Sequence, residues 1–110
     1  MADALNSFSL PDLDTTIEDI YTAPTSSVVS VLSCILGNKT ATATTVDAVI
    51  VRSGGTPTLY IVRGAPVPSG GALDVIVNKP IVLTAGDKLR ARAVALLTID
   101  VIGSVFEQIP

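Results

Sequence analysis

Residues 44–64 read TTVDAVIVRSGGTPTLYIVRG, and this stretch decides the fold class. Two runs rich in Val, Ile and Thr flank the turn Ser53-Gly54-Gly55. Branched side chains of this kind fit a pleated strand better than a helix. Glycine tolerates the positive φ angles that tight hairpin turns require. We therefore predict a β-hairpin over residues 44–64.

Gly and Pro interrupt the rest of the chain at similar intervals, which predicts further short strands. In residues 87–97, Leu and Ala alternate with Lys and Arg, so a strand is favoured over a helix capped by Asp87. We expect an all-β fold, a β-sandwich or jelly roll of about eight antiparallel strands. Besides the hairpin, the predicted strands cover residues 17–22, 26–36, 72–78, 81–84, 87–97 and 98–109, the last as one strand or two.

The first sixteen residues, MADALNSFSLPDLDTT, precede the first predicted strand. We therefore expect an extended N-terminal arm, residues 1–16, followed by a single β-sandwich domain, residues 17–110. The arm is apolar enough that docking against a neighbouring subunit and disorder both stay open. Its candidate partner contacts are Leu5, Phe8, Leu10 and Leu13.

The composition is unusually apolar for a small domain. Hydrophobic residues make up 48% of the 110 residues and charged residues only 15%, against about 25% in a typical domain. In the strand predicted over residues 44–52, both faces carry apolar side chains, including Val49 and Val51 on the face opposite Ile50. An exposed sheet face is ordinarily polar. We expect a second copy of the chain to cover such a face, in a homo-oligomer such as a trimer.

Several sequence features bear on location and on general partners. No apolar run approaches the roughly 20 residues of a membrane helix, and the acidic N-terminus lacks the features of a secretion signal. These observations predict synthesis in the cytoplasm and no membrane partner. A net charge of −3 argues against nucleic acid as a partner. The single cysteine, Cys34, lies in an apolar run and is predicted to be a buried core residue.

The sequence offers no recognisable catalytic or metal site. It contains no histidine, which excludes Ser-His and Cys-His nucleophiles and histidine-bound metals. The acidic run at residues 12–23 departs from a calcium loop at Ile17 and Ala23, where glycine and glutamate are needed, although an ion shared between subunits stays open. We predict a protein that is not an enzyme, with no catalytic residues, no cofactor and no metal ligands.

One polar pattern stands out in the predicted strand over residues 87–97. Lys88, Arg90 and Arg92 are spaced by two and would project from one face. Such a ladder could bind carboxylates of a neighbouring molecule. The alternative is a solvated strand face with scattered ion pairs. The three residues are therefore candidate partner contacts.

Two long segments carry a family resemblance. They are IYTAPTSSVVSVLSCILGNKTATATTVDAVIV at residues 20–51 and LYIVRGAPVPSGGALDVIVNKPIVLTAGDKLRARA at residues 59–93. The Tyr-Thr-x-Pro entry strand, the Pro-x-Pro-x-Gly loop and the Leu-x-x-Gly-Asp turn resemble those of small virion proteins of tailed bacteriophages, especially cyanobacterial and marine phages. The resemblance covers residues 17–109. It implies a β-sandwich or jelly-roll structural protein that forms homo-oligomers, commonly trimers, on the phage particle.

The function that this resemblance implies is structural. We expect a non-enzymatic virion protein, a capsid cement or decoration protein that stabilises the shell through contacts with itself and with the major capsid protein. A neck or tail component is the alternative. A sugar-binding or adhesion module is more distant, because the chain has only four aromatic residues to serve as sugar platforms.

Overall fold

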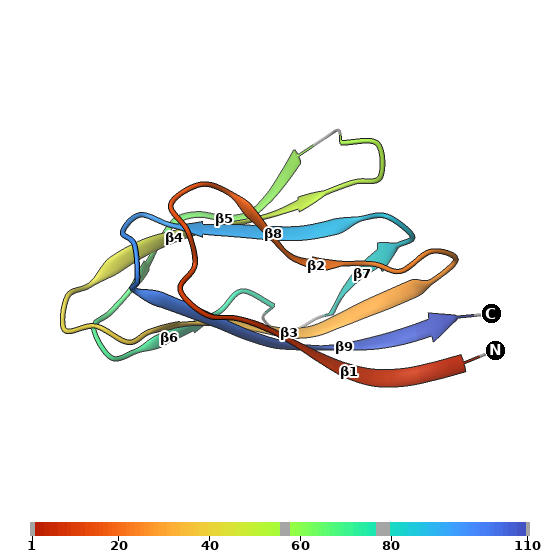
Figure 1. Cartoon of the computed structure of the whole chain (residues 1–110), viewed down its shortest axis with the longest axis horizontal. Coiled ribbons are helices and arrows are strands. Elements are labelled where there is room, and N and C mark those ends of the chain that lie inside the picture. The colour runs from red at the N-terminus through yellow and green to blue at the C-terminus, as the bar shows by residue number, and fades with distance from the viewer. Residues whose placement is uncertain (1, 56–57, 77–79, 110) are drawn as a thin grey trace.

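The computed structural model describes residues 2–55, 58–76 and 80–109 (Figure 1). Every regular element in these ranges is a strand, and no helix there is long and apolar enough to cross a membrane. The strands are β1 (Ala2–Leu10), β2 (Glu18–Thr22), β3 (Val28–Asn38), β4 (Thr44–Val51), β5 (Thr58–Val67), β6 (Ala72–Asp74), β7 (Ile81–Thr84), β8 (Lys88–Ala93) and β9 (Ile99–Ile109).

The strands form two antiparallel sheets that lie one above the other (Figure 1). Sheet A has the order β1-β9-β3-β6, with β7 also paired to β3, and sheet B has the order β2-β8-β4-β5. The accessible surface of 5800 Å² is close to the roughly 5,700 Å² expected for a compact monomeric protein of 11.3 kDa. The predicted all-β sandwich is confirmed.

Most predicted strands lie close to their expected positions. The hairpin over residues 44–64 is confirmed, because β4 pairs with β5 and the N–H of Gly55 donates to the carbonyl oxygen of Arg52 at 2.9 Å. β5 continues to Val67, three residues beyond the predicted strand. β8 ends at Ala93, so the predicted strand over residues 87–97 is too long. β6 is also shorter than predicted, and residues 77 and 78 of that prediction lie outside the described ranges.

The N-terminal segment is a strand of the sandwich and does not form a separate arm. β1 pairs with β9 without any register shift, from Ala2 opposite Ile109 to Leu10 opposite Val101. Residues 2–10 therefore belong to sheet A, and the boundary we predicted at residue 16 does not separate an arm from a domain. The ladder of backbone hydrogen bonds and the burial of Phe8 hold this segment in place.

The space between the sheets is filled by alternating inward side chains. The Phe8 ring lies over Gly103 and packs against the ring of Tyr21 with centroids 5.6 Å apart. Cys34 is fully buried, as predicted, and burial raises the pKa of its thiol to about 12. A thiol with so high a pKa is a poor nucleophile at neutral pH. Cys34 therefore serves as a core residue.

One polar contact crosses this core near the chain termini. Glu107 is buried and accepts hydrogen bonds from the hydroxyl of Tyr21 and, at 2.5 Å, from the amide of Asn6. Burial and the bond to Glu107 raise the pKa of the Tyr21 hydroxyl. Because Tyr21 belongs to sheet B and Glu107 to sheet A, the contact joins the two sheets.

A buried carboxylate joins two turns at one end of sheet B. Asp87 is 2% exposed and accepts hydrogen bonds from the backbone N–H of Ser53 at 2.8 Å and of Thr84 at 2.9 Å. Its second oxygen also accepts from the hydroxyl of Thr84 and from the guanidinium of Arg52. Asp87 thereby connects the β4–β5 turn to the β7–β8 turn.

Both faces of β4 are buried within the single chain. Val49 is fully buried and Val51 is 8% exposed, although they point away from the core. Arg90 lies opposite Val49 and Lys88 opposite Val51 on the adjacent β8. Long basic side chains cover apolar neighbours with their methylene stems. The burial of this face therefore needs no second copy, contrary to our expectation from the sequence.

Candidate interaction surface

The outer face of sheet A carries most of the large apolar side chains that remain exposed on the strands. Phe8 points into the core, so Leu5, three positions before it, points outward. We call this surface the apolar face and define it by its exposed members. They are Leu5, 71% exposed, Ile102, 58%, Val82, 49%, Val28, 45%, and Leu32, 43%.

The strand register arranges the apolar face in rows. One row runs from Leu5 to Phe106, Ser30 and Val82 across four strands. The next joins Ser33 and Ser104, whose hydroxyl groups lie 2.9 Å apart. Small hydroxyl side chains thus fill the positions between the apolar rows. Such a surface exposes few groups that must stay in water.

The charge on this sheet is unusually low. None of the strands β1, β3, β6, β7 and β9 contains Lys or Arg. Acidic side chains on the outer positions are confined to its ends, with Asp3 at one end and Asp74 and Asp100 at the other. The centre of the apolar face is therefore free of charge, which is the composition of the buried centre of a protein interface.

The basic ladder predicted from the sequence lies on the outer face of sheet B. Leu89, Ala91 and Ala93 are fully buried, so the predicted alternation is confirmed. The carboxylates that the ladder binds come from its own chain. Lys88 and Arg90 contact Asp19 at 3.4 and 2.7 Å. This part of the ladder corresponds to the alternative of scattered ion pairs.

Arg92, the last member of the ladder, pairs with a carboxylate that is more buried than Asp19. Nε of Arg92 lies 2.7 Å from Oδ2 of Asp47, whose other oxygen accepts from the N–H of Gly64 at 2.6 Å. Burial opposes ionisation of Asp47, but these bonds hold the pKa of that carboxyl below its ordinary value. Asp47, Arg92 and Arg63 line an open hollow of about 370 Å³. Among the described residues, no group of three or more His, Cys, Asp or Glu could hold a metal ion there.

The four arm residues predicted as partner contacts separate into two groups. Leu13 is fully buried and Phe8 is 9% exposed, and both belong to the core, while Leu10 is half-buried against it. These three side chains face their own sandwich because the segment that carries them is part of it. Only Leu5 remains available to another molecule.

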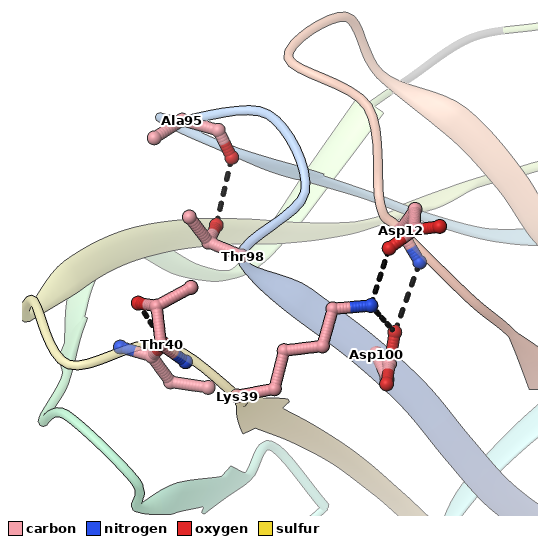
Figure 2. A network of polar contacts seen from close by, with 7 residues as sticks. Asp12, Lys39, Thr40, Ala95, Thr98 and Asp100 are labelled. Carbon is pink, nitrogen blue, oxygen red and sulfur yellow. Dashed lines mark hydrogen bonds and ion pairs between the residues drawn. The ribbon is translucent and has the colours of Figure 1, made fainter.

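The loop between β8 and β9 forms a second exposed apolar patch, which we call the apolar tip. Its members Val94, Leu96 and Leu97 are each more than 60% exposed. Leu97 adopts a φ of 60°, which is uncommon outside glycine and asparagine. The hydroxyl of Thr98 donates to the carbonyl oxygen of Ala95 at 2.7 Å and closes the turn (Figure 2). The sequence prediction missed this tip because it extended the strand through these residues.

Beside the apolar tip, one lysine joins three separate parts of the chain. Figure 2 shows Lys39, which follows β3, reaching Asp12 of the β1–β2 loop and Asp100 of β9. Its Nζ lies 2.8 Å from Oδ1 of Asp100, which also accepts the N–H of Asp12 at 3.0 Å. The bond from Lys39 lowers the pKa of Asp100. These contacts fasten the β1–β2 loop and the segment after β3 to β9 at this end of the sandwich.

No protein-family model matches the chain, and no curated protein matches it.

Proposed function

We propose that this chain is a non-enzymatic structural protein of a bacteriophage virion that acts as a capsid cement or decoration protein. The observation that carries the proposal is the apolar face, a sheet surface with five large exposed hydrophobic side chains and no Lys or Arg on any of its strands. A protein with such a face gains free energy by packing against others. Its partners would be further copies of itself, as a trimer or another closed oligomer, and the major capsid protein.

The order of the strands supports the finer description of the sandwich as a jelly roll. The first strand pairs with the last, β1 with β9, and the second with the second to last, β2 with β8. With this nested pairing, β1 to β4 alternate between the two sheets, as successive strands do in the jelly rolls of viral capsid domains, while β4 and β5 form a hairpin within sheet B. The shared fold is an analogy and adds to the argument from the surface.

The proposed mode of action is burial of apolar area across neighbouring shell subunits. Each Å² removed from water contributes roughly 25 cal/mol before the cost of association is subtracted. A face with no charge at its centre loses little polar hydration on contact. Such binding would strengthen with the number of shell subunits joined and would depend little on salt.

The proposal is tested by adding the purified protein to phage particles that lack it and measuring co-sedimentation. Ile102→Lys places a charge at the centre of the apolar face, and we expect it to weaken binding by about tenfold or more. The matched control is Leu59→Lys, which changes a leucine with 43% exposure on β5 of sheet B and should bind normally. Equal binding by both variants, or absence of the protein from particles by mass spectrometry, would overturn the proposal.

Copy number separates the cement role from the alternative role in the neck or tail. A decoration protein should be present in hundreds of copies for each particle, whereas closed rings at the neck or tail hold about three to twelve. Quantitative mass spectrometry against the major capsid protein measures this ratio. A low copy number would replace the cement role by the neck or tail role.

A further inference from the structure

The edge of sheet A formed by β1 differs from the other sheet edges. β1 has nine residues and pairs with β9 in one unbroken register. No strand pairs with its second edge in the described part of the chain. Alternate residues of an antiparallel edge strand direct their N–H and C=O groups away from the sheet. β1 thus presents a long row of backbone donors and acceptors.

The remaining edges carry features that block further pairing. β2 has five residues, a register shift after Asp19 and ion pairs from Asp19 to β8. β5 has register shifts and a positive φ at Gly64. It also contains Pro66, which has no N–H to donate. β6 and β7 have three and four residues. Short strands, bulges, charges and prolines are the means by which proteins prevent edge pairing.

β1 is long, has no bulge and carries only one charged side chain. It contains no proline, lysine or arginine, and its single charge is Asp3 near one end. We propose that β1 pairs antiparallel with β1 of a second copy of this chain, about a two-fold axis at Leu5, so that the two A sheets become one continuous sheet. This pairing rests on the proposed function and adds to it the contact through which copies of the chain join.

The side chains of β1 are compatible with a second copy of β1 pairing at this free edge. A two-fold axis through Leu5 and perpendicular to the sheet keeps outward residues with outward residues, because opposed positions then have the same parity. Leu5, 71% exposed, would meet Leu5 of the second copy, and Asp3 would lie opposite Ser7. Thus no like charges are opposed. Isologous two-fold contacts of this kind are the commonest in soluble oligomers.

The pairing also extends the apolar face. Leu5 ends the row that continues through Phe106, Ser30 and Val82. Joining two copies at Leu5 would connect both rows into one apolar band across the dimer. Leu5 would become a central residue of this band, which explains a large apolar side chain on an exposed edge.

Disulfide trapping tests the geometry directly. Opposed side chains in an antiparallel pair have Cβ atoms about 4.5–5.5 Å apart, close enough for a disulfide after small adjustments. Leu5→Cys should therefore give a covalent dimer under mild oxidation, seen on a non-reducing gel. The native Cys34 is fully buried and stays unreactive in every variant. The control is Ile102→Cys, which is 58% exposed on an interior strand and should remain uncoupled. Absence of the Leu5→Cys dimer, or equal coupling of the control, overturns the pairing.

Sedimentation velocity over a concentration series provides the second test. The native protein should reach a dimer, Leu5→Lys should remain a monomer because two ammonium groups would be opposed, and Leu59→Lys should dimerise like the native protein. Far-ultraviolet circular dichroism checks that each variant is folded. A native monomer throughout the series, or a Leu5→Lys dimer, overturns the pairing. A trimer without Leu5→Cys coupling would overturn the β1 pairing but not the proposed function. A dimer that never binds particles would overturn the proposed function but not the β1 pairing.

Discussion

The outward side chains of the two sheets differ in the contacts that they make within the chain. On sheet B, basic groups meet the carboxylates of Asp19 and Asp47 within the chain, and Arg90 and Lys88 lie over buried valines. On sheet A, the strands carry no Lys or Arg, and the apolar face stays in water. The outer face of sheet B thus has its charges paired and its valines covered by its own chain, whereas the apolar side chains of sheet A remain exposed.

This difference locates the excess hydrophobicity of the sequence. Much of the 48% hydrophobic content is buried in the core and beneath the basic side chains of sheet B. What remains exposed on the strands lies mainly on sheet A. The basic ladder is therefore a poorer candidate for partner contact than the apolar face. Each sheet also contains a distinctive internal contact, which is the close approach of Phe8 to Gly103 in sheet A and the buried carboxylate of Asp87 beside sheet B.

The largest effect is expected from a methyl group added to the interior of sheet A. In Gly103→Ala, the new Cβ would overlap the ring of Phe8 and lie 2.5 Å from the carbonyl oxygen of Ser33. Because Ser33 contributes rigid backbone, the strands must move apart. We expect a loss of about 3 kcal/mol in the free energy of unfolding, measured by urea denaturation.

Two further variants identify the cause of that loss. Ser7→Ala alters an exposed position of the neighbouring β1 and should leave stability within about 0.5 kcal/mol of the native value. Adding Phe8→Leu to Gly103→Ala should recover part of the loss, because the smaller side chain relieves one of the two overlaps. An unchanged urea midpoint for Gly103→Ala would show that the ring of Phe8 does not depend on a glycine beneath it.

A smaller effect is expected from the buried carboxylate of sheet B. Asp87→Asn places an amide donor against the donors of Thr84 and Arg52. Leaving such groups without an acceptor should lower the free energy of unfolding by about 2 kcal/mol in urea denaturation. Asp19→Asn, which weakens exposed ion pairs, is the matched control and should cost less than half as much. Equal losses would contradict the central role of Asp87.

The same carboxylate should make sheet B sensitive to acid. Burial opposes its ionisation, but hydrogen bonds from Thr84, Ser53 and Arg52 outweigh burial and lower the pKa of Asp87 from 3.8 to about 2. A carboxyl with a lowered folded-state pKa stabilises the protein fully above its unfolded-state pKa and loses this contribution as pH falls through the folded-state pKa. The stability difference between the native protein and Asp87→Asn should therefore narrow as the pH falls from about 4 to about 2. Urea titrations at several pH values measure it, and a constant difference would refute the assignment.

The elements predicted well are those whose alternation matches burial. In β8 every inward position is Leu or Ala and every outward one is basic, so the period of two was visible. β1 was missed because its two faces are mixed. Asn6 points inward to Glu107 while Leu5 points outward, which conceals the alternation. The pairing of Asn6 with a buried carboxylate and the exposure of Leu5 can be explained only once the neighbouring strand is known.

The candidate surface was less predictable than the fold. Asp47 is 45 positions from Arg92 in the sequence, and no local spacing signals that the two side chains are paired. The exposure of Leu5 likewise follows from the strand order, which places β1 at an edge of sheet A. Sequence periodicity shows which residues share a face but does not show what covers that face.

The smallest effect is expected from substitutions of Lys88, which test whether the outer face of sheet B is covered by side chains of its own chain. Lys88 lies 3.4 Å from Asp19, and both side chains are 44% exposed, so the loss of charge in Lys88→Ala should cost no more than about 0.5 kcal/mol. Lys88→Met retains most of the stem over Val51 and removes the charge. If Ala costs more than Met in urea denaturation, coverage of Val51 outweighs the ion pair. If both variants instead abolish binding to particles, Lys88 contacts a partner, and the outer face of sheet B joins the apolar face as an interaction surface.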